Sequence, residues 1–256
     1  MNEHSKRDAV GRDGVTEVRE ITLGNAEPAD YSAADIGPVE DESTRTLIAQ
    51  LESAEAPTRR RAALALARRE VGDSVRERLE SLARTDPDAQ VRQFAIEALG
   101  KVDGDPAVAL DVLESDEDPW VRAEATVALD RLDRDRFEDR FESLLEDEAE
   151  GVRRNALISL TRIRREAARE DLLYALSDPS DRVREWAVKL LGQYDDDGAV
   201  ESALERIVSE ESAVEIVRET AARSLGARGR DVDALLEEGT GTASADDHML
   251  NRVPDG

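Results

Sequence analysis

The sequence predicts an all-α fold, a right-handed α-solenoid of about six helix pairs, and three observations support this prediction. An arginine, usually preceded by valine, recurs six times at intervals of 30 to 34 residues. Every copy has an alanine three residues after the arginine and a leucine four residues later, which is the spacing of one helix face. Aromatic residues make up only 3% of the chain, so large aromatic side chains do not build its core. A constant register at such a period indicates a stack of repeats.

The recurring arginines mark the second helix of each pair. The small alanine that follows, such as Ala95, permits close approach of a neighbouring helix, and the leucine, such as Leu99, continues the apolar face. A shorter segment with its own apolar stripe precedes each of these helices, as in "DSVRERLESLAR" and "DPAVALDVLE". Each period therefore predicts two helices. The arginines are Arg59, Arg92, Arg122, Arg153, Arg184 and Arg218.

Proline and glycine mark the turns between the predicted helices. Asp-Pro pairs separate the two helices in three repeats, at Asp86, Asp118 and Asp178. Proline is tolerated at a helix start and disfavours helix in the residue before it, so each pair marks a stop and a restart. Glycine-containing turns such as "KVDGDP" join one repeat to the next.

The two ends of the chain lack the repeat. Residues 1–42 contain 11 acidic and four basic residues and no helical period, which predicts a disordered acidic segment. Residues 43–238 are expected to form the solenoid, with "DVDALLEE" at 231–238 as a helix that closes the stack. Residues 239–256 are expected to be a disordered tail.

The motif resembles HEAT repeats, and most closely the HEAT-like subclass first named for phycobilisome lyases. Residues 86–100, "DPDAQVRQFAIEALG", match that pattern almost completely, and the resemblance extends over about residues 43–229. The first copy departs with Thr58 before Arg59, and the fourth copy lacks the Asp-Pro pair. The resemblance implies an α-solenoid and leaves the function open, because this fold serves many unrelated functions.

The resemblance also implies a structural role for the recurring arginine, which in HEAT repeats commonly pairs with a turn acid of its own or a neighbouring repeat. The acids expected here precede an arginine by six or four residues and are Asp86, Asp118 and Asp178. The expected structural ladder consists of Arg59, Asp86, Arg92, Asp118, Arg122, Arg153, Asp178, Arg184 and Arg218.

The composition resembles that of a cytoplasmic protein from a halophilic archaeon. The formal net charge is -25, only three of the 35 basic residues are lysines, and there is no cysteine. In molar salt the Debye length falls to about 3 Å, so such charge mainly keeps the surface hydrated. No stretch approaches the roughly 20 apolar residues of a membrane span, and the first residues lack the apolar region of a secretory signal. A cytoplasmic location is therefore expected.

The residues of common active sites are scarce. The two histidines, His4 and His248, both lie in the predicted tails, where nothing would position them for acid–base chemistry or metal binding. No nucleophile elbow, phosphate-binding loop or dinucleotide motif is present. The sequence therefore predicts a protein that is not an enzyme and needs no cofactor or metal.

Two alternatives come from other classes of HEAT-type proteins. One is a lyase-like, chromophore-handling protein, although no residue singles out a tetrapyrrole. The other is a nucleic-acid-binding protein of the HEAT-like DNA glycosylase type, since Trp120, Trp186 and several arginine clusters are present. Acidic residues interleave throughout and duplex binding depends on phosphate neutralisation, so nucleic acid is not the expected partner. Deoxyhypusine hydroxylases hold iron with His-Glu pairs, and this chain has none.

The favoured function is a non-catalytic scaffold that binds a protein partner. In HEAT stacks the second helices line the concave face, and four positions there are apolar where a solvated face would be polar: Phe94, Val127, Ile158 and Trp186. Apolar patches often mark binding surfaces, and aromatic residues often anchor them. An extended peptide or a helix is the expected partner of a monomeric solenoid. The alternative is that curvature of the stack buries these side chains against adjacent helices.

Overall fold

The computed structural model describes residues 43–194, 198–210 and 213–231, and all regular elements within these residues are helical. The predicted disordered segments at 1–42 and 239–256 lie outside the described residues, as does almost all of the predicted closing helix at 231–238. No helix in the described part of the chain combines the length and apolar character needed to cross a membrane.

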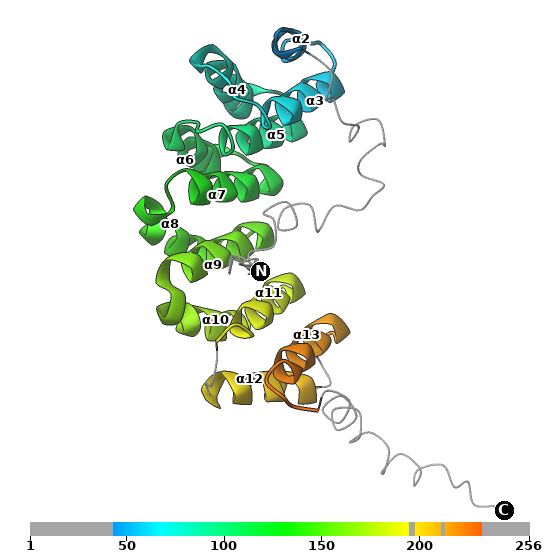
Figure 1. The fold of residues 1–256 in the computed structure, drawn as a ribbon, viewed down its shortest axis with the longest axis vertical. Helices are drawn as coiled ribbons and strands as arrows, with labels where there is room; N and C mark the ends of the chain where they lie inside the picture. Colours follow the sequence, from blue (N-terminus) through cyan, green and yellow to red (C-terminus); the bar gives the residue numbers. More distant parts are fainter. Residues whose placement is uncertain (1–42, 195–197, 211–212, 232–256) are drawn as a thin grey trace, which may run out of the picture.

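The helices form an α-solenoid of six pairs within the described residues, as predicted (Figure 1). The first three pairs are α2 (Thr44–Gln50) with α3 (Ala56–Leu66), α4 (Asp73–Thr85) with α5 (Ala89–Leu99), and α6 (Pro106–Ser115) with α7 (Pro119–Asp133). The last three are α8 (Glu138–Ser143) with α9 (Glu150–Arg164), α10 (Arg169–Ala175) with α11 (Asp181–Leu191), and α12 (Gly198–Ser209) with α13 (Glu215–Gly226). Short 3-10 helices flank α8 and α10, namely η2 (Arg134–Phe137), η3 (Leu144–Glu146) and η4 (Arg165–Ala168).

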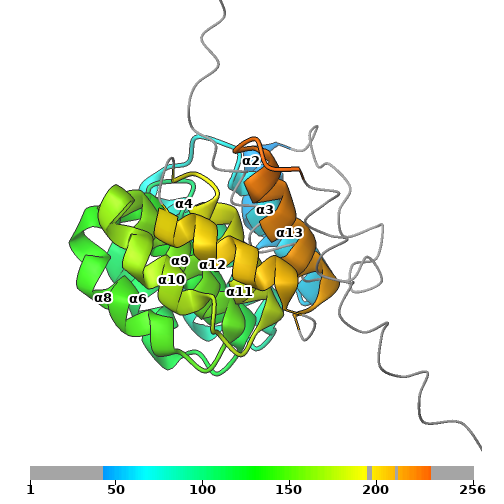
Figure 2. The same ribbon diagram turned by 90° about the horizontal axis from the view of Figure 1, so that it is seen from below.

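The second helices pack in sequence along one side of the stack. Each contacts the next, from α3 through α5, α7, α9 and α11 to α13. Viewed along the stack, α3 and α13 lie on one side and the first helices α6 and α8 on the other (Figure 2). Every repeat therefore presents one edge at which its first helix ends and its second helix begins. We call this edge the turn edge.

The core is aliphatic and consists of two clusters that meet in α9. Val152, Ala156 and Leu160 belong to the N-terminal cluster, whereas Leu157 and Ile158 belong to the C-terminal cluster. The first helix of the fourth repeat is divided into η2, α8 and η3 at the same level of the stack. The boundary between the fourth and fifth repeats is thus a seam in the packing.

The recurring arginine joins successive repeats. Arg59 donates to both carboxylate oxygens of Asp86 at 2.7 Å, and Arg92 makes the same fork to Asp116 at 2.7 and 2.9 Å. Arg153 pairs in the same way with Asp178, at 2.8 and 2.7 Å. Hydrogen bonding to these carboxylates holds the pKa of each of the three guanidinium groups above its usual value. Each arginine therefore binds a turn acid of the next repeat.

The same acid is held from its own repeat through its backbone. The acid lies six residues before the arginine of its own repeat. The Nη1 group of that arginine donates to the backbone carbonyl oxygen of the acid, at 2.9 Å from Arg92 to Asp86 and at 2.7 Å from Arg184 to Asp178. Its carboxylate also accepts from the backbone N–H of the residue that caps the second helix, as Asp86 does from Asp88 at 3.0 Å. One turn acid thus ties two arginines and a helix start together.

Two positions of the predicted ladder need correction. Asp118 is not a ladder acid, because its carboxylate caps α7 by accepting from the N–H groups of Trp120 and Val121 at 2.8 and 3.2 Å. Asp116, two residues earlier, takes the role. In the fourth repeat, which lacks the Asp-Pro pair, Asp147 occupies the equivalent position at 3.5 Å from Arg122 Nη2, with Glu148 at 3.0 Å.

The ladder changes at its C-terminal end. Arg184 pairs with Asp181, three residues before it on α11, and Arg218 donates to the carbonyl oxygen of Val208 at 3.1 Å. The fork to an acid of the next repeat is therefore a feature of Arg59, Arg92 and Arg153 among the predicted arginines, and Arg122 has a looser version of it.

A tyrosine provides a separate contact across the seam. Tyr194 follows α11, is 7% exposed and donates its hydroxyl to the carbonyl oxygen of Arg165 at 2.6 Å. Burial raises the pKa of Tyr194 to about 12, and the nearby carboxylates of Glu166 and Asp171 act in the same direction.

The corrected ladder can be tested by two double-mutant cycles. We expect Arg92→Ala and Asp116→Ala to couple by about 1–3 kcal/mol in the free energy of unfolding, because they contact each other directly. Arg92→Ala and Asp118→Ala should couple by less than about 1 kcal/mol, since the Asp118 carboxylate caps α7 and acts on Arg92 only through its charge. Urea denaturation of the six proteins gives both values, and equal coupling in the two cycles would contradict the assignment.

The buried tyrosine predicts a pH dependence. The unfolded chain loses the phenolic proton near pH 10 and the folded chain only near pH 12, so the contribution of Tyr194 to stability is complete below pH 10 and is lost as pH rises through 12. Relative to Tyr194→Phe, the wild-type free energy of unfolding should fall by up to about 1.4 kcal/mol per pH unit in this window. Denaturant titrations at pH 9, 10, 11 and 12 measure the difference, and parallel pH profiles would disprove it.

Candidate partner-binding surface

Two of the four predicted contact residues on the second helices are buried. Val127 on α7 is 5% exposed and Ile158 on α9 is 4% exposed. Helix α7 packs against α5, α6 and α9, and all its residues from Ala123 to Asp130 are buried. Ile158 is part of the C-terminal core cluster. The prediction that Val127 and Ile158 contact a partner is therefore wrong, because both side chains are buried.

The middle second helices also bury polar side chains. Asn155 on α9 donates its side-chain N–H to the carbonyl oxygen of Ala123 on α7 at 2.8 Å. Asp130 on α7 accepts from Arg134 at 2.7 Å and also pairs with Arg162 of α9. These contacts connect the third and fourth repeats laterally. The two second helices α7 and α9 are thus joined by buried polar side chains, and the sequence offered no apolar pattern from which to recognise these contacts.

Arg154 is the least satisfied of these buried groups. It is 2% exposed, and its Nη2 has no hydrogen-bond partner. Burial lowers the pKa of Arg154 to about 10, and the positive charge of Arg182 adds to the effect. The carboxylates of Glu150, Glu185 and Glu124 oppose this shift.

Phe94 and Trp186 remain partly accessible. Phe94 on α5 packs against the N-terminal cluster, and Trp186 on α11 packs against the C-terminal cluster, with intermediate exposure for both. The ammonium group of Lys189, one turn further along α11, lies 4.3 Å from the centre of the Trp186 ring. These two residues lie three repeats apart and the apolar positions between them are buried, so the predicted continuous apolar strip is absent from the described surface.

The exposed apolar side chains gather elsewhere. In the described part of the chain, four large apolar residues are clearly exposed: Trp120 at 40%, Tyr174 at 69%, Val214 at 37% and Ile216 at 45%. Trp120 and Ile216 lie in the first turn of α7 and α13, Val214 caps α13, and Tyr174 is near the end of α10. All four therefore lie on the turn edge. Of these four, only Trp120 had been noted from the sequence, because single exposed residues follow no periodic pattern.

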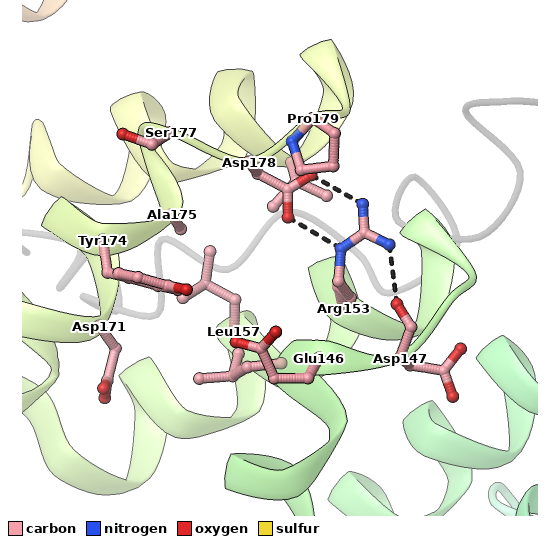
Figure 3. Close-up of a pocket in the computed structure, with 12 residues that line it drawn as sticks. Glu146, Asp147, Arg153, Leu157, Asp171, Tyr174, Ala175, Ser177, Asp178 and Pro179 are labelled. Atoms are coloured by element: carbon pink, nitrogen blue, oxygen red, sulfur yellow. Dashed lines mark hydrogen bonds and ion pairs between the residues drawn. The ribbon is translucent and has the colours of Figure 1, made fainter.

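The turn edge is hollowed at two adjoining places. A cleft of about 290 Å³ lies between the turn before α9 and the facing parts of α10 and α11 (Figure 3). A wider depression of about 760 Å³ lies between the starts of α11 and α13 and includes Val214 and Ile216. Pro179 lines both, so the two adjoin at this residue. The cleft coincides with the seam, since Leu145 on its wall packs against both core clusters.

The edge is acidic. Acidic side chains lining the cleft and the depression are Glu146, Asp147, Glu150, Asp171, Asp178, Asp181 and Glu185, and the basic ones are Arg153 and Arg182. Among the described residues, no group of three or more acidic or imidazole side chains is arranged to hold a metal ion. The arrangement can bind through apolar contact and negative charge.

The fold and this surface define the class of an α-solenoid repeat protein. A family model described as HEAT repeats matches residues 44–130, 106–173 and 169–247. The chain belongs to the HEAT-repeat family. No curated protein matches it.

Three solved structures of other proteins are similar to this chain to different degrees. The Escherichia coli protein YibA is 19% identical, with 89% of this chain and 93% of that chain covered and a TM-score of 0.53. The complex of CpcE and CpcF of phycocyanin lyase from Nostoc is 16% identical, with 79% and 97% covered and a TM-score of 0.41. Human deoxyhypusine hydroxylase is 21% identical, with 78% of each chain covered and a TM-score of 0.33. The similarity to YibA, at 19% identity, shows the fold alone and carries no information on activity.

The burial of Ile158 makes a direct prediction. Ile158→Ala should lower the free energy of unfolding by about 2–5 kcal/mol, because it removes a buried side chain from the core. Tyr174→Ala, at an exposed position, should change it by less than about 0.5 kcal/mol. Urea denaturation of the two variants compares them. A change of less than about 0.5 kcal/mol for Ile158→Ala would contradict its burial and would restore it as a candidate contact residue.

Proposed function

We propose that this protein is a non-catalytic scaffold that binds a protein partner along its turn edge. The observation that carries the proposal is the location of the four exposed apolar residues, all of which lie on this edge. Exposed apolar patches are typical of protein interaction sites, and aromatic residues commonly dominate their binding energy. The chain offers two such residues there, Trp120 and Tyr174.

The geometry favours an elongated partner. Trp120 lies in the third repeat and Ile216 in the sixth, and packed helices are separated by about 10 Å, so these side chains are roughly 30 Å apart. An extended segment of about ten residues covers this distance. Tyr174 and Val214 lie between them in the chain, in the fifth and sixth repeats. The cleft and the depression supply contacts between the anchors.

The charge of the edge favours a protein over a nucleic acid. Seven acidic and two basic side chains line its two hollows, and such a surface repels phosphate groups. The wide depression is open and the cleft is small, whereas a cofactor generally requires a larger enclosed pocket. A lyase-like function would need a site for a chromophore. Neither hollow suits a chromophore better than it suits a peptide.

The proposal is tested by comparing two surfaces of the same protein. Each protein is immobilised, the bound proteins of its native lysate are identified, and binding of the captured partner is then measured quantitatively. The edge variant combines Trp120→Ser with Ile216→Ser, and the matched control is Trp186→Ala on the concave side. The edge variant should weaken binding of the captured partner by at least about 30-fold, the effect of losing a hot spot of about 2 kcal/mol.

The control separates the two surfaces. Trp186→Ala should retain binding within about threefold, and circular dichroism should show unchanged helicity for both proteins. Loss of binding in Trp186→Ala alone would move the site to the concave face. Full binding by the edge variant would contradict the proposal.

A further inference from the structure

We infer that the cleft between η3 and α10 accommodates an arginine side chain from an extended segment of the partner. This inference rests on the proposed function and names the chemistry that one part of the turn edge recognises. It depends on the apolar floor of the cleft, on the state of its charged groups and on its size.

The floor of the cleft suits an aliphatic stem. Leu157 and Val183 are 1% and 2% exposed and form part of the C-terminal core cluster, and Ala175 is 8% exposed. Tyr174 stands beside them with 69% of its surface exposed, and its ring borders the opening (Figure 3). Long basic side chains pack their methylene groups on surfaces of this kind while the charged end stays near polar groups.

The single cation of the cleft cannot recruit an anion. Arg153 directs Nε and Nη2 to Asp178 at 2.8 and 2.7 Å. Its Nη1 donates to the carbonyl oxygens of Asp147 and Glu148 at 2.8 and 3.1 Å. The guanidinium is therefore neutralised and directed into the scaffold, so the remaining charge of the lining is negative.

The acids of the cleft differ in how far they are already engaged. Asp178 is taken by Arg153, and Asp171 accepts from Arg164 at 3.0 Å. Asp147 lies 3.5 Å from Arg122 and accepts from the N–H of Ala149. The carboxylate of Glu146 is exposed and makes no hydrogen bond or ion pair with any described residue. A carboxylate without a partner, next to three partly neutralised ones, favours a cation at this point.

Arginine fits the cleft better than other cations. A planar guanidinium can stack on the Tyr174 ring and at the same time donate two parallel hydrogen bonds to Glu146. The volume of about 290 Å³ is near the lower limit for a small-molecule pocket and is sufficient for one long side chain. Lysine carries a strongly hydrated point charge and can make only one of these two contacts well.

The adjoining depression extends the recognised sequence. It begins on the other side of Pro179 and exposes Val214 and Ile216, one repeat further along the stack. One repeat is about 10 Å, which an extended chain covers in about three residues. The edge therefore suits a segment with an arginine and an apolar residue three positions apart.

A synthetic peptide tests the inference without knowledge of the partner. The probe is a fluorescent Gly/Ser peptide that contains one arginine and one leucine three residues apart, and fluorescence anisotropy measures its binding to the full chain. Two matched peptides replace the arginine by lysine or by citrulline, which is neutral and of the same shape. We expect the citrulline peptide to bind at least about tenfold more weakly, and the lysine peptide to lie between the two.

Protein variants locate the binding site. Glu146→Gln and Tyr174→Ala should each weaken binding of the arginine peptide by about five- to tenfold. Glu117→Gln is the control, because it makes the same charge change at an exposed position in the third repeat, outside the cleft. It should change binding by less than about twofold.

Four outcomes would overturn the inference. They are equal binding of the arginine and citrulline peptides, equal effects of Glu117→Gln and Glu146→Gln, an unchanged affinity in Tyr174→Ala, and no binding of the arginine peptide at about 1 mM. If the peptide fails while the Trp120 and Ile216 edge variant still loses its captured partner, the arginine site is wrong and the proposed function stands.

Discussion

The solenoid depends on one contact that recurs along the turn edge, the fork between an arginine and an acid of the next repeat. The acid is held twice, as Asp86 is: its carboxylate accepts from Arg59 of the preceding repeat, and its carbonyl oxygen accepts from Arg92 of its own repeat. A planar guanidinium that meets a carboxylate with two parallel hydrogen bonds has little rotational freedom. Apolar faces alone would tolerate sliding between repeats. The forks set the register in which Ala and Leu of successive helices meet.

The ladder also explains why the turn edge can be hollowed without loss of the fold. At the seam between the fourth and fifth repeats the core divides into two clusters, and Arg153 with Asp178 spans the division. The first helix of the fourth repeat is divided there, and Leu145 at its end lines the cleft. Structural and binding residues thus share one edge, and the acids that hold the scaffold together also give the edge its charge.

The middle of the stack is held together by a different kind of contact. On α7 and α9 the side chains facing away from the apolar core are buried polar groups, joined by lateral contacts such as Asn155 with Ala123 and Asp130 with Arg162. Buried polar groups need specific partners, so they tolerate fewer alternative packings than aliphatic side chains. To bind another protein here, the buried polar groups of α7 and α9 would have to give up their present hydrogen bonds and ion pairs. Binding at the turn edge breaks no such contacts, because the apolar residues there are already exposed.

The sequence by itself determined the helix pairs, the solenoid and the identity of the arginines, because these follow from local spacing. Even the correct acids were present in the spacing, since Asp116, Asp147 and Asp178 all lie six residues before an arginine, whereas Asp118 lies four before and caps its helix. Only the tertiary structure decided which apolar residues are accessible. Val127 and Trp186 occupy similar places in the motif and differ in exposure, because burial depends on which helices surround a position, and no local pattern records that. For the same reason the sequence did not reveal that Tyr174 and Ile216 are exposed, since the two residues come to lie on one edge only when the repeats stack.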